Sequence, residues 1–327
     1  MNEKIFKYIY PNKNDIFSNI NGSDLLELFN LLNDYYIEYR DNLNFSKDIT
    51  FGLELEFENV KYRKLLDKFN ALKSEWIMKH DPSLDDGAEI NSPILTDEKI
   101  YWDQLKKICL FVQKNGHVGL NSGGHVHIGA HILENEKLYF LNFVKLWSVY
   151  ENVIFRFCYG EFLTERVNMY KYAAPVSNDF WNAYNILKNN LDNIKKKFLY
   201  EDRRAVNLDN FLFDCGYFLK NTIEFRCPNG TLDPVIWQNN VNLFVKLLKY
   251  SKSNNFNDDL LSERHEINKN EYSNLEYYKE IYLDEAIEFC DLIFNNNLDK
   301  INFLRQYLKS FKIGNGKLDK VKKFTSY

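Results

Sequence analysis

The sequence lacks the markers of several common protein classes. Its five cysteines are odd in number and scattered without a CxxC pair, so neither a disulfide framework nor a thiolate zinc site is indicated. No stretch approaches the roughly 18 uninterrupted apolar residues that a membrane-spanning helix needs. The opening MNEKIFKYIYPNKND contains no apolar signal-peptide core. We therefore expect a soluble, cytoplasmic protein with no membrane partner.

An excess of positive charge is also missing. The 42 lysines and arginines are outnumbered by 46 acidic residues, which gives a formal net charge of −4. Nonspecific binding to nucleic acid relies on a basic field, so no nucleic-acid partner is expected. There is no GxxxxGK[ST] loop and no GxGxxG after a strand, and GNGK at 314–317 does not complete the pattern. These absences argue against a P-loop or a dinucleotide-binding fold.

What is present predicts one large, mixed domain. The chain has 327 residues, of which 45% are hydrophobic, enough for one elaborated core. Strands and helices are interleaved, but several strand pairs are joined too closely for parallel crossovers. This predicts an α+β fold with a largely antiparallel, curved sheet and helices packed on one face. We expect an N-terminal helical extension at 1–48, a catalytic core at 49–252 and a C-terminal helical region at 253–327.

Hydrophobic periodicity predicts the individual elements. Strict alternation indicates a strand over 49–60, and Pro234 lies near the start of a helix after the turn residues Asn229 and Gly230. Helical spacing or length predicts helices over 23–40, 62–72, 96–116, 137–157 and 178–200. Further strands are expected over 76–79, 88–91, 210–219 and 222–227, with a strand pair within 117–132.

The segment FGLELEFE has an acidic face. Because strand side chains alternate with period two, Glu54, Glu56 and Glu58 point one way and the apolar residues between them point the other. A half-buried strand with a solvated acidic face would explain this pattern. However, three carboxylates at this spacing repel one another unless a cation or an arginine lies among them, and no lysine or arginine alternates with them here.

The segment HVHIGAHI repeats the arrangement with histidines. His125, His127 and His131 share one face of the predicted strand, preceded by the flexible NSGG. The first two could clamp a metal or could be satisfied by hydrogen bonds, whereas His131 better fits solvent or a hydrogen bond. Oxygen and nitrogen ligands without a thiolate suit Mg2+ or Mn2+ better than structural zinc.

A third segment, TIEFRC, places Glu224 and Arg226 on one face of a strand. Alone, such a pair is typical of a surface ion pair of little energetic value. The three segments together favour another interpretation, because pairing them in one sheet gives a single acidic, histidine-bearing surface. Such a surface requires bound cations to offset its charge.

Four motifs in order carry a family resemblance. They are GLELE at 52–56, DPSLDDGAEINSP at 81–93, SGGHVHI at 122–128 and TIEFRCPNGTLD at 222–233. With them the chain resembles the glutamine synthetase and glutamate-cysteine ligase superfamily, and most closely its amidoligase branch. The resemblance implies an antiparallel sheet curved around ATP and Mg2+ or Mn2+. It also implies phosphorylation of a carboxylate followed by attack of an amine, with a small-molecule or peptide carboxylate and an amine as substrates.

The resemblance also implies two sets of metal ligands. The chain departs from the pattern at Asp81, where glutamate is common in glutamine synthetase, so Asp85 or Asp86 could replace it. By motif position, the metal that bridges the ATP phosphates would be held by Glu54, His125 and Glu224, and the metal nearer the substrate by Glu56, Glu89 and Asp81.

Other residues receive roles from the same resemblance. His127 would face the nucleotide phosphates, and Arg226 would meet the transferring phosphoryl group. Arg204 would also contact the nucleotide. Arg166, Arg204 or Asn207 could bind a substrate carboxylate, or could be solvated surface residues.

Two alternative functions stay open at this stage. A metal-dependent hydrolase could use the HxH pair to activate water without ATP. A nucleotide-binding module could keep the sheet but lack turnover. The sequence specifies neither the acid, the amine nor the oligomeric state.

Overall fold

The structure is a computed structural model that describes residues 39–84, 86–162, 164–188, 203–211 and 221–308. Within these ranges the chain has the α+β architecture that the sequence predicts. The helix predicted over 23–40 falls largely outside the described residues.

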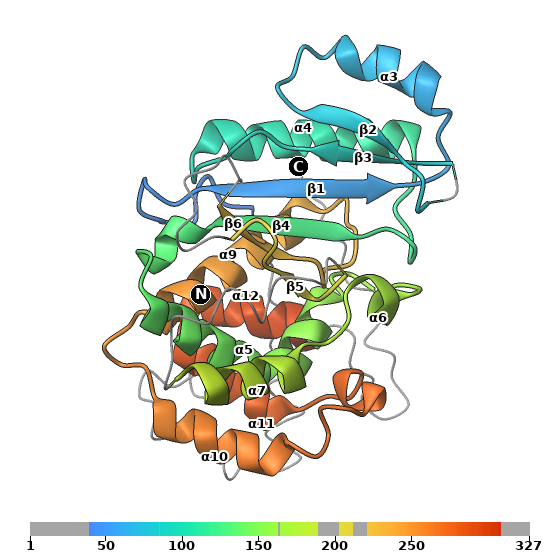
Figure 1. Cartoon of the computed structure of the whole chain (residues 1–327). Coiled ribbons are helices and arrows are strands. Elements are labelled where there is room, and N and C mark those ends of the chain that lie inside the picture. The colour runs from blue at the N-terminus through green and yellow to red at the C-terminus, as the bar shows by residue number, and fades with distance from the viewer. Residues whose placement is uncertain (1–38, 85, 163, 189–202, 212–220, 309–327) are drawn as a thin grey trace, which may run out of the picture.

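A six-stranded sheet forms the centre of the fold (Figure 1). Its spatial order is β2-β3-β1-β4-β6-β5, and each neighbouring pair is antiparallel. This order places β1 in the middle of the sheet and brings β6, from much later in the chain, beside β4. The strands are β1 Phe51–Phe57, β2 Ile77–Asp81, β3 Gly87–Asn91, β4 Gly124–Gly129, β5 Val206–Asn207 and β6 Thr222–Phe225.

Helices make up most of the remaining described chain. At the start of α9, the Asp233 side chain accepts a hydrogen bond from the Val235 amide, and Pro234 occupies the first turn, as predicted. The α-helices are α3 Tyr62–Asn70, α4 Lys99–Asn115, α5 Lys137–Cys158, α6 Met169–Tyr172, α7 Ser177–Leu187, α9 Pro234–Ser251, α10 Asp258–Asn268, α11 Leu283–Ile293 and α12 Asn297–Leu308. Two 3-10 helices cover Ala130–Leu133 and Leu275–Tyr278.

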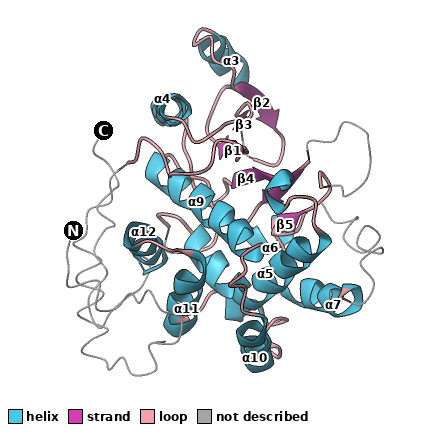
Figure 2. Cartoon of the chain, turned by 90° about the vertical axis from the view of Figure 1, so that its left-hand side faces the viewer, coloured by secondary structure: helices cyan, strands magenta, loops and turns pink. Residues whose placement is uncertain are grey.

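The apolar face of the sheet is buried against helices. Phe51 of β1 stacks on Trp102 of α4 with ring centroids 5.0 Å apart, and Phe225 of β6 stacks on Phe244 of α9 at 4.0 Å. Trp147 of α5 also packs on Phe225. Figure 2 shows α5, α9, α11 and α12 gathered on one side of the strands. Because alternate residues point to opposite faces, this packing leaves the charged side chains on the other face.

The C-terminal helices pack onto the core rather than extending away from it. Helices α10, α11 and α12 contact α5, and α11 and α12 also contact α9. Arg40, from the last residues of the predicted N-terminal extension, forms a 2.7 Å ion pair with Asp299 of α12. The division into three regions stays a prediction. Among the described helices, none has the length and apolar character needed to cross a membrane.

The strand pair predicted within 117–132 was wrong. Only β4 forms there as a strand, and His117 makes an isolated bridge to Glu58. The strand ends at Gly129, so His131 lies in a 3-10 helix and not on the strand face. Its Nε2 bonds the carbonyl of Asp48, and its ring lies so close to Gly129 that a Cβ there would be 2.4 Å from it. The chain therefore leaves the strand after Gly129, where the His131 ring packs back against the backbone.

The strand predicted over 210–219 lies mostly outside the described residues, and the described Asn210 and Phe211 are not in a strand. A two-residue strand that periodicity missed, β5, pairs with β6. The strand predicted over 222–227 forms over Thr222–Phe225. The amide of Arg226 still bonds the Ala205 carbonyl at 2.9 Å, which extends the ladder by one residue.

Candidate active site

Strand register gathers the acidic and histidine side chains on one face. Glu54 of β1 lies directly opposite His125 of β4, and His127 lies opposite Glu224 of β6. Directly opposed residues have Cβ atoms about 4.5–5.5 Å apart, close enough for their side chains to interact. Three segments that are distant in sequence therefore share one polar surface, as the alternation predicts.

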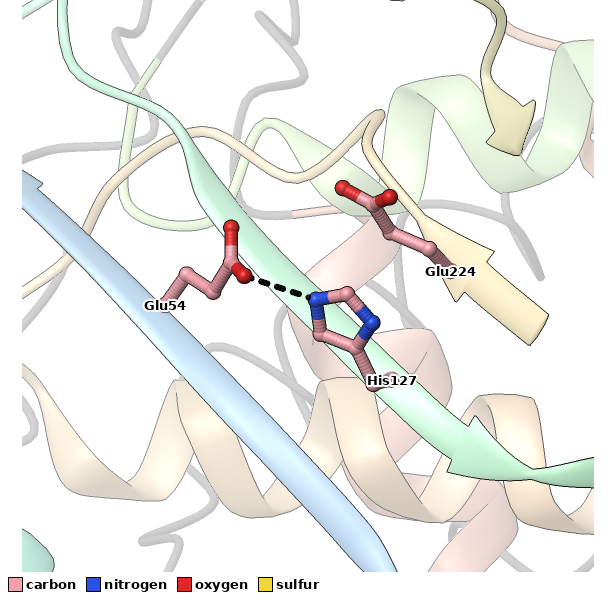
Figure 3. Close-up of side chains that lie close together, drawn as sticks. All are labelled: Glu54, His127 and Glu224. Atoms are coloured by element: carbon pink, nitrogen blue, oxygen red, sulfur yellow. Dashed lines mark hydrogen bonds and ion pairs between the residues drawn. The ribbon is translucent and has the colours of Figure 1, made fainter. Parts of the chain in front are cut away.

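Glu54, His127 and Glu224 form what we call the first acidic group (Figure 3). One ligand atom from each lies within 4.8 Å of the others. The Nε2 of His127 is 3.0 Å from a Glu54 carboxylate oxygen. The three side chains project from the neighbouring strands β1, β4 and β6. This spacing is compatible with several ligands around one ion.

His125 lies between the carboxylates. Its Nδ1 is 3.0 Å from Glu54 Oε2 and 3.5 Å from Glu224 Oε1, and its Nε2 is 3.4 Å from Glu56 Oε1. Both histidines of the HxH motif are thus close to Glu54. Which of them would ligate a metal, and whether His127 faces nucleotide phosphates, remain predictions from the resemblance.

Glu56, Asp81 and Glu89 form the second acidic group, with ligand atoms again within 4.8 Å of one another. Glu56 and Glu89 are directly opposed on β1 and β3, and Asp81 ends β2. This is the trio that the motif positions suggest for the metal nearer the substrate. Asp85 lies outside the described residues, so the alternative that involves it stays open.

The pKa values of two carboxyl groups in the site, Glu54 and Glu89, are shifted in opposite directions. Burial alone would raise the pKa of the Glu54 carboxyl, but hydrogen bonds and charge from His125 and His127 outweigh it and hold this pKa well below its usual range. Burial and the neighbouring charge of Glu54 instead raise the pKa of Glu89. The Glu54 carboxyl therefore strongly favours its ionised form, whereas a hydrogen bond from Asn91 and the charge of His125 do not offset the opposing effects on Glu89.

Two further side chains hold Glu224. The Nη1 of Arg226 is 2.5 Å from Glu224 Oε1, and the Nδ2 of Asn207 donates to Oε2 at 2.9 Å. Arg226 is partly exposed, and its Nε donates to the Tyr172 carbonyl. The structure thus places Arg226 on the polar surface as predicted, and places Asn207 against a carboxylate of the chain itself.

The remaining candidate arginines lie in different surroundings. Arg204 makes a 2.7 Å ion pair with Asp179 of α7 and also bonds the Pro175 carbonyl. Arg166 is only 4% exposed, and its Nη1 is 3.7 Å from Glu56 Oε2. The Arg166 guanidinium therefore lies beside a carboxylate of the polar surface. The ion pair of Arg204 instead holds the Arg204 side chain against α7.

Both acidic groups suit a divalent cation by the chemistry of their donors. The first group offers two carboxylates and an imidazole and the second offers three carboxylates, and both sets match the preference of Mg2+ and Mn2+ for hard ligands. The Nδ1 of His127 is buried without a hydrogen-bond partner among the described residues, which leaves a polar atom to be satisfied. The structure contains residues that could hold such ions.

A comparison with known families now identifies the chain. The model of a family described as "Putative amidoligase enzyme" matches residues 78–248, just over half of the sequence. The chain belongs to this amidoligase family. The match includes most of β2 and all of β3, β4, β5 and β6, whereas β1 with Glu54 and Glu56 precedes it. No curated protein matches the chain.

Sequence reasoning missed some contacts of this candidate site. The Nδ2 of Asn91 donates to Glu54 at 3.3 Å, and the amide of Gly123 donates to Glu56 Oε2 at 2.5 Å. The position of Asn91 could have been found, because it lies two residues after Glu89 and so shares its face. The backbone contact of Gly123 leaves no comparable pattern in the sequence.

Proposed function

We propose that this amidoligase is an ATP-dependent carboxylate-amine ligase that forms an amide or peptide bond through an acyl phosphate. The observation that carries the proposal is the polar face on which both acidic groups and Arg226 meet. Phosphoryl transfer depends on placement and charge neutralisation more than on covalent participation by the protein. A rigid sheet with two acidic groups and a guanidinium supplies these requirements.

In this proposal each acidic group would hold Mg2+ or Mn2+, which when bound would neutralise phosphate charge. The residues we assign are Glu54, His125 or His127, and Glu224 for one ion, and Glu56, Asp81 and Glu89 for the other. Arg226 would bind equatorial oxygens of the transferring phosphoryl group, because its planar guanidinium can donate two parallel hydrogen bonds. Its present contacts with Glu224 and the Tyr172 carbonyl fix its direction.

The proposed reaction balances in two steps. A carboxylate oxygen of the substrate attacks the γ-phosphorus of ATP, the bond from that phosphorus to the bridging oxygen breaks, and ADP leaves. An amine nitrogen then attacks the carbonyl carbon, inorganic phosphate leaves with the former carboxylate oxygen, and the nitrogen loses a proton. The intermediate must be kept from water until the amine arrives.

An isotope experiment tests this chemistry directly. Purified protein is incubated with ATP, Mg2+, pooled 18O-carboxylates and pooled amines, and the products are analysed by mass spectrometry. We expect ADP formation that requires a carboxylate, a new amide when an amine is also present, and one 18O atom in the released phosphate. AMP with pyrophosphate would indicate an acyl adenylate, and an 18O-free phosphate would exclude the acyl phosphate.

Two further measurements separate the alternatives. A metal-dependent hydrolase would cleave a substrate in reactions without ATP. An inactive nucleotide-binding module would bind ATP in calorimetry but release no ADP with any pool.

A further inference from the structure

Arg166 has a buried guanidinium that contacts Glu56 of the second acidic group and the backbone carbonyl of Arg226. Its Nη1 lies 3.7 Å from Glu56 Oε2, in the second acidic group, and its Nη2 donates to the Arg226 carbonyl at 2.9 Å. Only 4% of the residue is exposed. Burial lowers the pKa of its guanidinium and the charge of Glu56 opposes this shift, but the group stays protonated because arginine is not deprotonated in proteins. A permanent positive charge is therefore built in beside Glu56.

Gly123 makes room for this guanidinium. A Cβ added to Gly123 would lie 1.7 Å from Arg166 Nη1 and 2.9 Å from Glu56 Oε2, so any side chain there would displace the arginine. The amide of Gly123 meanwhile donates to the same carboxylate oxygen. The glycine is required for close approach and not for an unusual backbone conformation.

Asn229 fixes the segment that carries Arg166. Its Oδ1 accepts a hydrogen bond from the Arg166 amide at 3.1 Å, and its Nδ2 donates to the carbonyls of Tyr159 and Thr164. Asn229 itself is buried and its amide bonds the Cys158 carbonyl. The arginine is thus held at its backbone as well as at its guanidinium, and its place in the site is set by the fold.

We propose that Arg166 is the built-in counter-charge of the second acidic group. Among the described residues, it is the arginine that forms an ion pair with this group, whose three carboxylates otherwise repel one another. It stabilises the protein when no cation is bound and weakens the attraction of the group for a cation. The inference rests on the proposed function, in which this group holds Mg2+ or Mn2+.

The proposed role of Arg166 predicts a measurable change in how strongly Mn2+ binding stabilises the protein. A ligand that binds only the folded protein stabilises it, and at a given ligand concentration the stabilisation increases with the logarithm of the affinity. Without Arg166, the metal-free protein loses its counter-charge, and a divalent cation relieves more repulsion than before. The variant should therefore be less stable without metal and respond more strongly to Mn2+.

The test measures melting temperature and Mn2+ affinity of the full chain, with and without Mn2+ after chelator treatment. For Arg166→Met we expect a lower melting temperature without metal, a larger rise with Mn2+ than in wild type, and Mn2+ binding tighter on the order of tenfold. Arg166→Lys retains the charge and should stay near wild type. Gly123→Ala should resemble Arg166→Met, and the double variant should show no further change.

A matched control distinguishes this role from a general contribution to folding. Arg264 pairs with Glu288 through two hydrogen bonds between α10 and α11, away from the sheet. Arg264→Met should lower the melting temperature equally with and without Mn2+. An unchanged or smaller Mn2+ response in both Arg166→Met and Gly123→Ala would overturn the counter-charge inference alone. A wild-type protein that binds no Mn2+ would overturn the proposed metal site as well.

Discussion

Glu224 and Arg226, two residues apart on the same face of the β6 segment, are joined by an ion pair of 2.5 Å. Glu224 is buried within the first acidic group, whereas Arg226 is partly exposed. Since the carboxylate is 4% exposed and also accepts a hydrogen bond from Asn207, the contact is more constrained than an ordinary surface pair. Arg226 thus has a structural contact that coexists with its proposed catalytic role.

Replacing Arg226 by lysine separates these two roles. Lysine keeps the charge near Glu224 but cannot reproduce the planar donor arrangement, so Arg226→Lys should reduce kcat on the order of 10³-fold. Affinities for Mn2+ and a nonhydrolysable ATP analogue should stay close to wild type. Steady-state kinetics with the substrates found by isotope analysis, together with calorimetry, measure both. The contrary result is that Arg226→Lys abolishes metal binding in much of the protein while the fraction that still binds metal turns over normally. That result would assign Arg226 a structural role only.

The second acidic group should depend strongly on Glu56. Glu56→Ala removes the carboxylate that lies opposite Glu89 and close to Asp81, so Mn2+ affinity should fall roughly tenfold or more. Calorimetric titration in the presence of a nonhydrolysable ATP analogue measures this. Glu263→Ala, at an exposed position on α10, is the control. Equal affinities for Glu56→Ala and wild type would reject the assignment.

Asn207 should act through Glu224. The Asn207 amide is buried and fixes one carboxylate oxygen at 2.9 Å, so Asn207→Ala should weaken metal binding on the order of tenfold by freeing that oxygen. Mn2+ titration gives the affinity, and Asn182→Ala on the exposed side of α7 serves as control. If Asn207 instead binds a substrate carboxylate, its loss would raise the KM for that substrate and leave Mn2+ affinity intact.

His265 should make stability depend on pH far from the site. It stacks on Trp181 with centroids 3.4 Å apart, and burial, with help from Lys269 and Lys145, lowers its pKa to about 4 against the opposing charge of Glu266. The unfolded chain, with a pKa near 6.5, then binds more protons between these values. Stability is therefore lost as the pH falls from about 6.5 to about 4.

Denaturant titrations at several pH values test this contribution. The difference in unfolding free energy between wild type and His265→Phe should change by up to about 1.4 kcal/mol per pH unit within that window, to the disadvantage of wild type at low pH. Above pH 7 the difference should be constant. Parallel curves for the two proteins from pH 7 to 4 would show that His265 titrates normally.

Local periodicity predicted much of this fold. The alternation around Glu54, His127 and Glu224 gave both the strands and the shared polar face, because period two is a property of any strand. The turn at Gly129 was missed, since it depends on where the His131 ring packs. The two-residue strand β5 is too short to show a period.

The surroundings of the candidate site were less accessible to sequence reasoning. The contact of Arg166 with Glu56 depends on the path of the chain after α5 and on hydrogen bonds from Asn229. Asn207 meets Glu224 because β5 pairs with β6 in one register. Such contacts arise from tertiary structure, so no local pattern specifies them.

The strand order has a consequence for synthesis of the protein on the ribosome. Strands β1 to β4 emerge first, and β4 then has an unpaired edge until β6, beyond α5 and α7, has been translated. During this interval the nascent chain exposes a template for pairing with other strands, a recognised route to aggregation. The first acidic group also cannot exist before Glu224 has left the exit tunnel. A cation can therefore stabilise the complete first group only late in synthesis, after β1 and β4, which carry Glu54 and His127, have already been made.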